Sequence, residues 1–371
     1  MNDISDVECA YGESSRKGMV FIAAIGVCTL TAFLISLCVG PVTIGIEDVL
    51  RSIGHSVVPD LVGGPEKPWY QNIVINGRMS RSLLCILCGI SLGISGAVMQ
   101  NILRNPLVSP FTLGVSSAAS FGAAMAIVFG PALFGTLMTG SVDILGMEFL
   151  NENLIIVLFA FLSGMLSIFI VIMLSRRRDL SRSTIILAGV IISYLFQAGV
   201  SLAKYMSTDD ALREITLWLM GGMWNASWSV DAILIPMVLI CFILLESMSV
   251  RVNILSAGDE VAESLGVNVS RLRTTGLVVS TLMTSACLAF TGVIGFIGLM
   301  APHICRMFIG NDSRFLFPAA SLLGALILIV SDTVARIVIS PEELPVGIIM
   351  YIIGGIFFIW LISRRNKEVN M

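Results

Sequence analysis

The side chains in this sequence that bind metals in other proteins are few and far apart. Cys85 and Cys88 are spaced so that their sulfurs share one face of a helix, and His55 and His303 are the only histidines. A structural zinc ion takes about four such ligands, and no second cysteine pair or nearby histidine completes that number. We therefore predict that both cysteines pack in a helix and that the protein needs no metal or other cofactor. His303 is expected to make a structural hydrogen bond rather than relay protons.

The residues that hydrolytic and ATP-driven chemistry require are also missing. A carboxylate-pair protease would need two acids inside the membrane, and Asp332 is the only acid that we place well inside a hydrophobic segment. A phosphate-binding loop needs a lysine directly after a glycine, and none of the lysines has that neighbour. The chain is thus predicted to be no enzyme, and any ATP that drives it must be hydrolysed by another subunit.

Asp332 and Arg336 stand four residues apart, near the outer end of a hydrophobic segment. Charges inside a membrane are costly and usually functional, and the i, i+4 spacing favours an ion pair between the two side chains. Such a pair is compatible with a role for Arg336 in binding a partner. Gly89 and Gly93 are also four apart, which predicts a face where another helix packs closely.

The elements that carry these residues are hydrophobic helices. Hydrophobic residues make up 56% of the 371 residues and charged residues 13%, about half the charged share of a soluble domain, and mean hydropathy is +0.94. A membrane-spanning helix needs about 20 apolar residues. We expect an all-α polytopic membrane protein, with an eighth span too short to cross alone. The ten predicted spans are 18–39, 82–103, 112–130, 153–174, 184–204, 229–247, 274–292, 296–308, 316–338 and 344–362.

An even number of spans places both termini on one side of the membrane. Most of the 22 basic residues lie in the loops and tails of that side, with the densest group at Arg176–Arg178, which predicts that both termini are cytoplasmic. The first span is expected to remain as an uncleaved helix of a plasma (inner) membrane protein. The chain then divides into a tail at 1–17, a transmembrane domain at 18–365 and a tail at 366–371.

Three predicted loops are long enough to hold structure of their own. Loops 40–81 and 205–228 are expected on the outer side, and loop 248–273 on the cytoplasmic side. The segment between Gly258 and Gly266 in the last loop predicts a short helix, because glycine favours helix ends.

The two halves of the chain show a weak internal repeat. Ser95–Val98 is followed by Asn105–Leu107, and Thr291–Ile294 is followed by Ala301–His303. Two halves of five helices, inverted relative to each other, are a common plan of transporters.

Short motifs in both halves form an ordered series. The first half carries Gly77–Arg81, Gly96–Gln100 and Arg104–Leu107. The second half carries Trp218–Gly222, Thr291–Leu299, Ala301–Ile304, Ser331–Arg336 and Glu343–Gly347. This series resembles the FecCD family, the permease subunits of ABC importers for ferric siderophores, haem and cobalamin, from about residue 18 to residue 365. The resemblance implies a type II ABC importer permease fold with two inverted five-helix halves.

The resemblance also implies partners. A second permease subunit, either an identical copy or a paralogue, completes a central path. Two ABC ATPase subunits bind on the cytoplasmic side, and an extracytoplasmic solute-binding protein delivers a chelated iron or corrinoid ligand. No nucleic acid is implied.

Site residues follow from position within the family's motifs. Outer arginines that meet acids of the binding protein correspond here to Arg78, Arg81 and Arg336. Loop 253–268 resembles the helices that seat in the ATPase. The residues expected to couple there are Ala257, Gly258, Asp259, Glu260, Ala262, Leu265 and Gly266. The cytoplasmic gate is expected at Asn105, Pro106, Leu107 and Ser181, and Arg182 is bulkier than the small hydroxyl residue that the family's pattern has beside Ser181.

We predict the permease of an ATP-driven importer for a ferric siderophore. A cobalamin or haem importer of the same family is the alternative, because the binding protein largely selects the ligand. An ion-coupled secondary transporter would need buried acids along its path, and Asp332 alone does not supply them.

Overall fold

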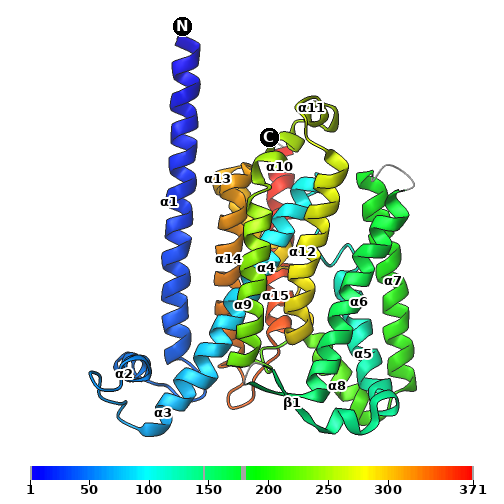
Figure 1. The fold of residues 1–371 in the computed structure, drawn as a ribbon. Coiled ribbons are helices and arrows are strands. Elements are labelled where there is room, and N and C mark those ends of the chain that lie inside the picture. Colours follow the sequence, from blue (N-terminus) through cyan, green and yellow to red (C-terminus); the bar gives the residue numbers. More distant parts are fainter. Residues whose placement is uncertain (1, 145–146, 177–180, 370–371) are drawn as a thin grey trace.

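The computed structural model describes residues 2–144, 147–176 and 181–369, and these are almost wholly helical (Figure 1). The long helices are α1 (Asn2–Cys38), α4 (Ser80–Leu103), α5 (Val115–Phe134), α6 (Asn151–Arg176), α7 (Arg182–Met206), α9 (Trp228–Glu246), α12 (Val269–Thr291), α14 (Ser313–Ala335) and α15 (Val346–Val369). The shorter elements are α2 (Ile46–Val57), α3 (Pro68–Asn72), the π-helix η1 (Ile73–Met79), the 3-10 helix η2 (Gly135–Thr139), β1 (Ser141–Ile144), β2 (Met147–Leu150), α8 (Asp209–Met220), α10 (Ser249–Ser256), α11 (Asp259–Ser264) and α13 (Ile297–Ile309).

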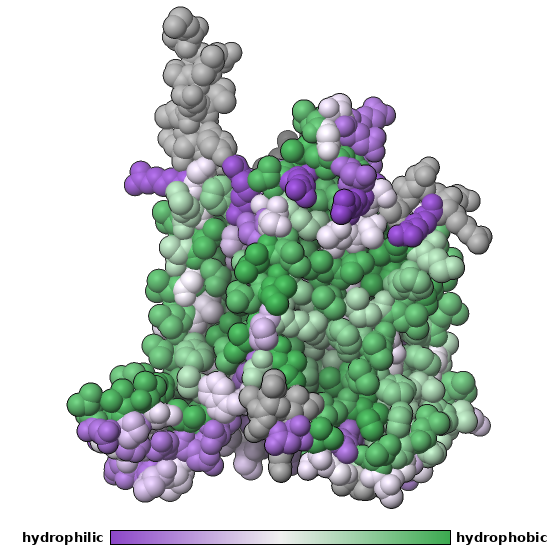
Figure 2. All heavy atoms as spheres, viewed as in Figure 1, coloured by the Kyte–Doolittle hydropathy of each residue, from purple (hydrophilic) through white to green (hydrophobic). Residues whose placement is uncertain are grey.

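The predicted membrane spans are confirmed. The described part of the chain holds nine helices long and apolar enough to cross a membrane, and α13 is a shorter apolar helix, as expected for the eighth predicted span. Polar side chains gather at the two ends of the molecule, around α11 and around α2 and α3, with a hydrophobic belt between them (Figure 2). A belt of this kind is what the hydrocarbon core of a bilayer requires.

The molecule therefore has two polar ends, which we name by their helices. The α11 face carries α10 and α11, together with the N-terminal end of α1 and the C-terminal end of α15 (Figure 1). The α8 face, at the opposite end, carries α2, α3, α8 and the antiparallel hairpin of β1 and β2. Both ends of the described chain thus lie on the α11 face.

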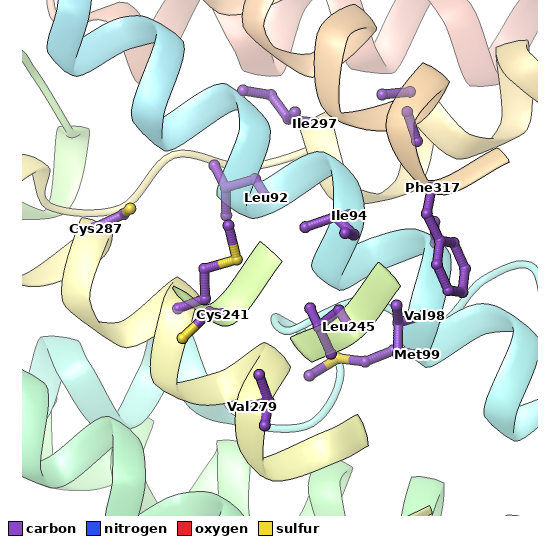
Figure 3. Packing of buried hydrophobic residues seen from close by; sticks show 14 of the residues in the cluster. Leu92, Ile94, Val98, Met99, Cys241, Leu245, Val279, Cys287, Ile297 and Phe317 are labelled. Atoms are coloured by element: carbon purple, nitrogen blue, oxygen red, sulfur yellow. The ribbon is translucent and has the colours of Figure 1, made fainter. Parts of the chain in front are cut away.

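Helix α4 forms the centre of the bundle. It packs against α14, α12, α13 and α9. Leu92 and Met99 of α4 join Leu245 of α9, Val279 of α12 and Phe317 of α14 in one cluster of buried side chains (Figure 3). Cys85 and Cys88 belong to the same cluster and are fully buried, so they are packing residues of α4, as predicted.

Small residues let α4 approach its neighbours closely. A Cβ atom on Gly89 would lie 2.5 Å from the backbone of Ala325 in α14, and one on Gly93 would lie 2.2 Å from the Ala320 carbonyl oxygen. The predicted close-packing face is therefore real, and its partner is α14. Close backbone contact supplies van der Waals attraction that lipid cannot replace.

A second group of helices lies beside this centre. Helices α5, α6 and α7 pack against one another, and α8 packs against α5. Helix α8 lies within the predicted loop 205–228. Thr208 caps its first turn by accepting a hydrogen bond from the Ala211 N–H, at 3.5 Å.

Loop 40–81 differs from expectation, because its first part holds α2 and its second part is helical up to the start of α4. Residues Pro68–Leu103 form one continuous helical segment through α3, η1 and α4. Proline at the start of α3 suits a first helical turn, since its missing N–H would have no partner there. The π-helix then admits an extra residue without ending the helix, so the breaker residue Gly77 does not mark a boundary.

Candidate functional site

A cluster of charged side chains is buried at the α8 face. Arg81 of α4 binds Asp332 of α14, with 2.9 Å between its Nη2 and the carboxylate Oδ1. Its Nη1 binds Glu343 Oε2 at 2.5 Å. Asp332 also pairs with Arg336, as the i, i+4 spacing predicted, at 3.1 Å. The Asp332 side chain is fully buried, so two guanidinium groups compensate its charge within the protein.

Arg336 and the neighbouring Arg78 form hydrogen bonds at the C-terminal end of α1. Arg336 donates to the Ser36 hydroxyl at 2.7 Å. Arg78 donates to the carbonyl oxygen of Leu37 at 2.7 Å and to that of Val42. Carbonyls at a helix end have no partner within the helix, and these guanidinium groups provide one.

The structure thus brings together Arg78, Arg81 and Arg336, which the sequence predicted as docking residues. In this conformation their guanidinium groups bind carboxylates and carbonyls of the chain itself. Arg81 and Glu343 keep some exposure, with 12% and 29% of their side chains accessible. Contact with a solute-binding protein stays a prediction for these three arginines.

The predicted short helix of the 248–273 loop is confirmed as α11 on the other face. Gly258 precedes it with φ of 142°, and Gly266 follows it with φ of 81°, conformations that side chains with a Cβ rarely adopt. Ala262 is buried against the bundle, whereas Val261 and Leu265 are 44% and 63% exposed. Two apolar side chains are therefore exposed here, Val261 within α11 and Leu265 directly after it, among the exposed acids Glu260 and Glu263.

Both predicted gate segments lie on the α11 face. Arg104 ends α4 in the left-handed conformation, with φ of 47°. The Asn105 side chain then accepts a hydrogen bond from the Leu107 N–H at 2.9 Å, which fixes a tight turn. Ser181 caps α7 by accepting a hydrogen bond from the Thr184 N–H at 3.3 Å. Leu107 is 63% exposed at the tip of its turn.

A polar cavity of 650 Å³ opens beside the first gate segment. Its walls include Gln100, Asn101, Arg104, His303 and Arg306. Arg306 donates to Gln100 Oε1 and, at 2.8 Å, to Asn101 Oδ1. The His303 ring makes an edge-on contact with that of Phe357, so the histidine packs against α15 while it lines the cavity. Within the described residues no group of histidines, cysteines and acids forms a metal site.

Sequence reasoning missed several charged residues of these sites. Glu343 completes the Arg81 cluster, and Arg104, Arg182 and Arg273 surround Asp259. The departure of Arg182 from the family pattern was a usable signal for that second cluster. The sequence also gave no role to Asp231, which lies in the first turn of α9 and is fully buried.

Comparison with known proteins places the whole chain in one family. The model of the FecCD transport family matches residues 28–364. A hemin transport system permease protein of Yersinia pestis is 37% identical over 80% of this chain and 85% of its own length. A vitamin B12 import system permease protein of Salmonella arizonae is 32% identical over 96% of this chain and 97% of its own length.

A solved structure agrees with the fold. It is described as an inward-facing conformation of a transporter assigned to the metal-chelate ABC type. It is 30% identical in sequence, superposes with a TM-score of 0.77, and covers 92% of this chain and 98% of its own. Family, helix order and fold agree along the length of the molecule, and the chain therefore belongs to the FecCD family and is a multi-pass membrane permease of an ABC importer.

Proposed function

We propose that this permease carries a ferric siderophore or a similar iron chelate into the cell. The observation that carries the proposal is the likeness, over 92% of the chain, to the transporter of the metal-chelate type. A solute-binding protein outside the membrane delivers the chelate, and two separate ATPase subunits hydrolyse ATP. A second permease subunit completes the path.

The orientation follows from charge. Arginines of the loops and helix ends collect at the α11 face, among them Arg182, Arg251, Arg271 and Arg314. Basic residues favour the cytoplasmic side of a membrane. We therefore assign the α11 face to the cytoplasm and the α8 face, with Arg81 and its neighbours, to the outside.

The outer face supplies the docking site in this proposal. Arg81 shares its guanidinium between the buried Asp332 and the partly exposed Glu343. An acidic residue of the binding protein competes with Glu343 for the same N–H donors. Guanidinium and carboxylate groups pair in a fixed planar geometry, which would orient the docked protein.

Helix α11 supplies the contact with the ATPase. Val261 of α11 and Leu265 directly after it are exposed and provide apolar surface on the cytoplasmic face, and burying such surface drives protein association. Closure of the ATPase dimer on ATP binding moves α11, and the transport path changes its open side because the two states bind the partners differently.

Haem or cobalamin is the alternative cargo. The relatives named for hemin and vitamin B12 align with 80% and 96% of this chain. This likeness makes haem and cobalamin the second candidates for the cargo. The identity of the cargo is tested by titrating the cognate binding protein with a ferric siderophore, haem and cobalamin.

Transport should rank the three ligands in the same order as their affinities for the binding protein. Proteoliposomes that hold the permease, its ATPase subunits and the binding protein should accumulate the tightest ligand only when ATP is supplied. Preferred binding and uptake of cobalamin or haem would replace the iron chelate as cargo. Uptake driven by an ion gradient without ATP would contradict the mechanism.

A further inference from the structure

Four charged side chains converge at the start of α11. The carboxylate of Asp259 lies 2.7 Å from Arg273 Nη2, 3.5 Å from Arg182 Nη2 and 3.8 Å from Arg104 Nη2. These arginines come from α12, from the first turn of α7 and from the end of α4, respectively. One carboxylate of a short helix thus contacts three long helices.

The two oxygens of Asp259 have different surroundings. Oδ2 accepts a hydrogen bond from Arg273, whose side chain is only 5% exposed. Oδ1 faces Arg182 and Arg104 at distances longer than a hydrogen bond. Arg104 also donates to the Leu255 carbonyl oxygen at the end of α10. Asp259 is therefore fixed to α12 through Oδ2. Its Oδ1 lies near Arg104 and Arg182 but forms a hydrogen bond with neither of them.

The position of these two arginines is the important point. Arg104 directly precedes the gate segment Asn105–Leu107, and Arg182 directly follows the gate residue Ser181. Packing of α11 involves mainly α10 and α12, so the ion pairs extend its reach to both gate segments. With distances of 3.5 and 3.8 Å, a displacement of roughly 1 Å is enough to bring Oδ1 into hydrogen-bond distance of either arginine.

We propose that Asp259 is a positioning residue that links α11 to the two gate segments, by exchanging its Oδ1 contact between Arg104 and Arg182 as α11 moves. This inference rests on the proposed function, since it gives the motion of α11 its route to the gate. It also explains the arginine at position 182, which the family's small hydroxyl residue could not replace in this contact.

The charge balance supports the assignment. Burial opposes ionisation of Asp259, but the hydrogen bond and charge of Arg273, with the charges of Arg182 and Arg104, outweigh it and lower the pKa of the carboxyl. The carboxylate is then ionised at neutral pH. The positive charges of Arg182 and Arg273 oppose that of Arg104, so without Asp259 the ends of α4, α7 and α12 repel one another.

The test is Asp259→Asn, which keeps the size of the side chain and removes its charge. In proteoliposomes of the full complex, the measured quantity is the ratio of ATPase activity with and without the loaded binding protein. We expect Asp259→Asn to lower this ratio by about ten-fold, within the range typical of coupling between sites. Asp60→Asn, which removes an exposed charge from the segment between α2 and α3, is the control and should leave the ratio unchanged.

The double variant separates a shared contact from two independent effects. Arg182→Gln should lower the ratio too, and Asp259→Asn combined with Arg182→Gln should be no worse than Asp259→Asn alone. An unchanged ratio in either single variant, or losses that multiply in the double variant, would overturn the proposal. Because the Arg182 side chain is 34% exposed, that variant remains informative if Asp259→Asn does not assemble.

Hydrogen exchange of the purified permease keeps this inference distinct from the proposed function. Amides of segments 104–108 and 181–185 should exchange faster in Asp259→Asn than in the natural chain or in Asp60→Asn. Unaltered exchange in both segments refutes the link, whatever the ATPase does. Faster exchange together with an unstimulated natural complex would leave the link standing and would reject the proposed function.

Discussion

Asp332 has no exposed surface, and two arginines share its charge. Replacing it by asparagine leaves Arg336 buried without its carboxylate and Arg81 with Glu343 alone, and breaking a buried ion pair costs about 3–5 kcal/mol. We expect Asp332→Asn to lower the thermal unfolding midpoint of the purified protein by about 10 °C. Asp60→Asn changes an exposed acid of the same face and serves as the control. An equal midpoint in both variants would show that Asp332 does not stabilise the fold.

Glu343 offers a direct test of docking at Arg81. In Glu343→Gln, the guanidinium of Arg81 loses an anionic partner, so its N–H groups become more available to a carboxylate of the binding protein. We expect the dissociation constant of that protein to fall by about three- to ten-fold, as for one charge-assisted hydrogen bond. Binding is measured by titration in nanodiscs, and Glu342→Gln, an exposed neighbour, is the control. Equal affinity of both variants would remove Arg81 from the docking site.

At the residue scale, local spacing was the usable signal. Asp332 and Arg336 lie on one turn of a helix, so their pairing follows from the sequence alone. Arg81 and Asp332 are separated by 251 residues, and only the packing of α4 against α14 brings them together. Sequence pattern therefore finds the charged residues of a membrane protein but leaves their long-range partners open.

The packing of α4 against α13 depends on Gly96, although alanine would favour the helical conformation more strongly than glycine. A Cβ atom on Gly96 would lie 1.9 Å from the Gly298 carbonyl oxygen. Backbone atoms cannot move aside as a flexible side chain does, so Gly96→Ala must separate the two helices. We expect strongly reduced yield of folded protein in size-exclusion chromatography. Gly355→Ala, in a helix with nothing within 4 Å of the added atom, should keep the natural yield, and equal losses in both would contradict the packing argument.

Element boundaries show which signals in the sequence were sufficient. Each predicted span coincides with a helix, because runs of apolar residues between breakers are unambiguous in a membrane protein. The helical start at Pro68 was missed, since Lys67 and Asn72 read as loop residues and the π-helix carries Gly77 without a break. The β1–β2 hairpin was missed as well, because strands of four residues carry little periodicity.

The whole molecule has an asymmetry that its hydrophobic belt alone does not reveal. Both polar faces hold charged helices (Figure 2), and acids occupy the first turns of α2, α8 and α11 alike. At α11, three arginines surround one of these acids, Asp259. The two ends of the chain lie with the arginines (Figure 1). If basic residues remain inside during membrane insertion, α11 and both termini share the cytoplasm with the ATPase, and the cluster of Arg81 meets the solute-binding protein outside.

Single cysteines placed on the two faces test this orientation. In a variant without native cysteines, Asp60→Cys puts an accessible thiol near α2, and Glu263→Cys puts one on α11, since both positions are exposed. A membrane-impermeant maleimide should label Asp60→Cys in intact cells and Glu263→Cys only after the membrane is opened. Labelling both in opened membranes controls for reactivity. The reverse pattern would invert the protein, and would place the arginines around Asp259 where no ATPase can reach them.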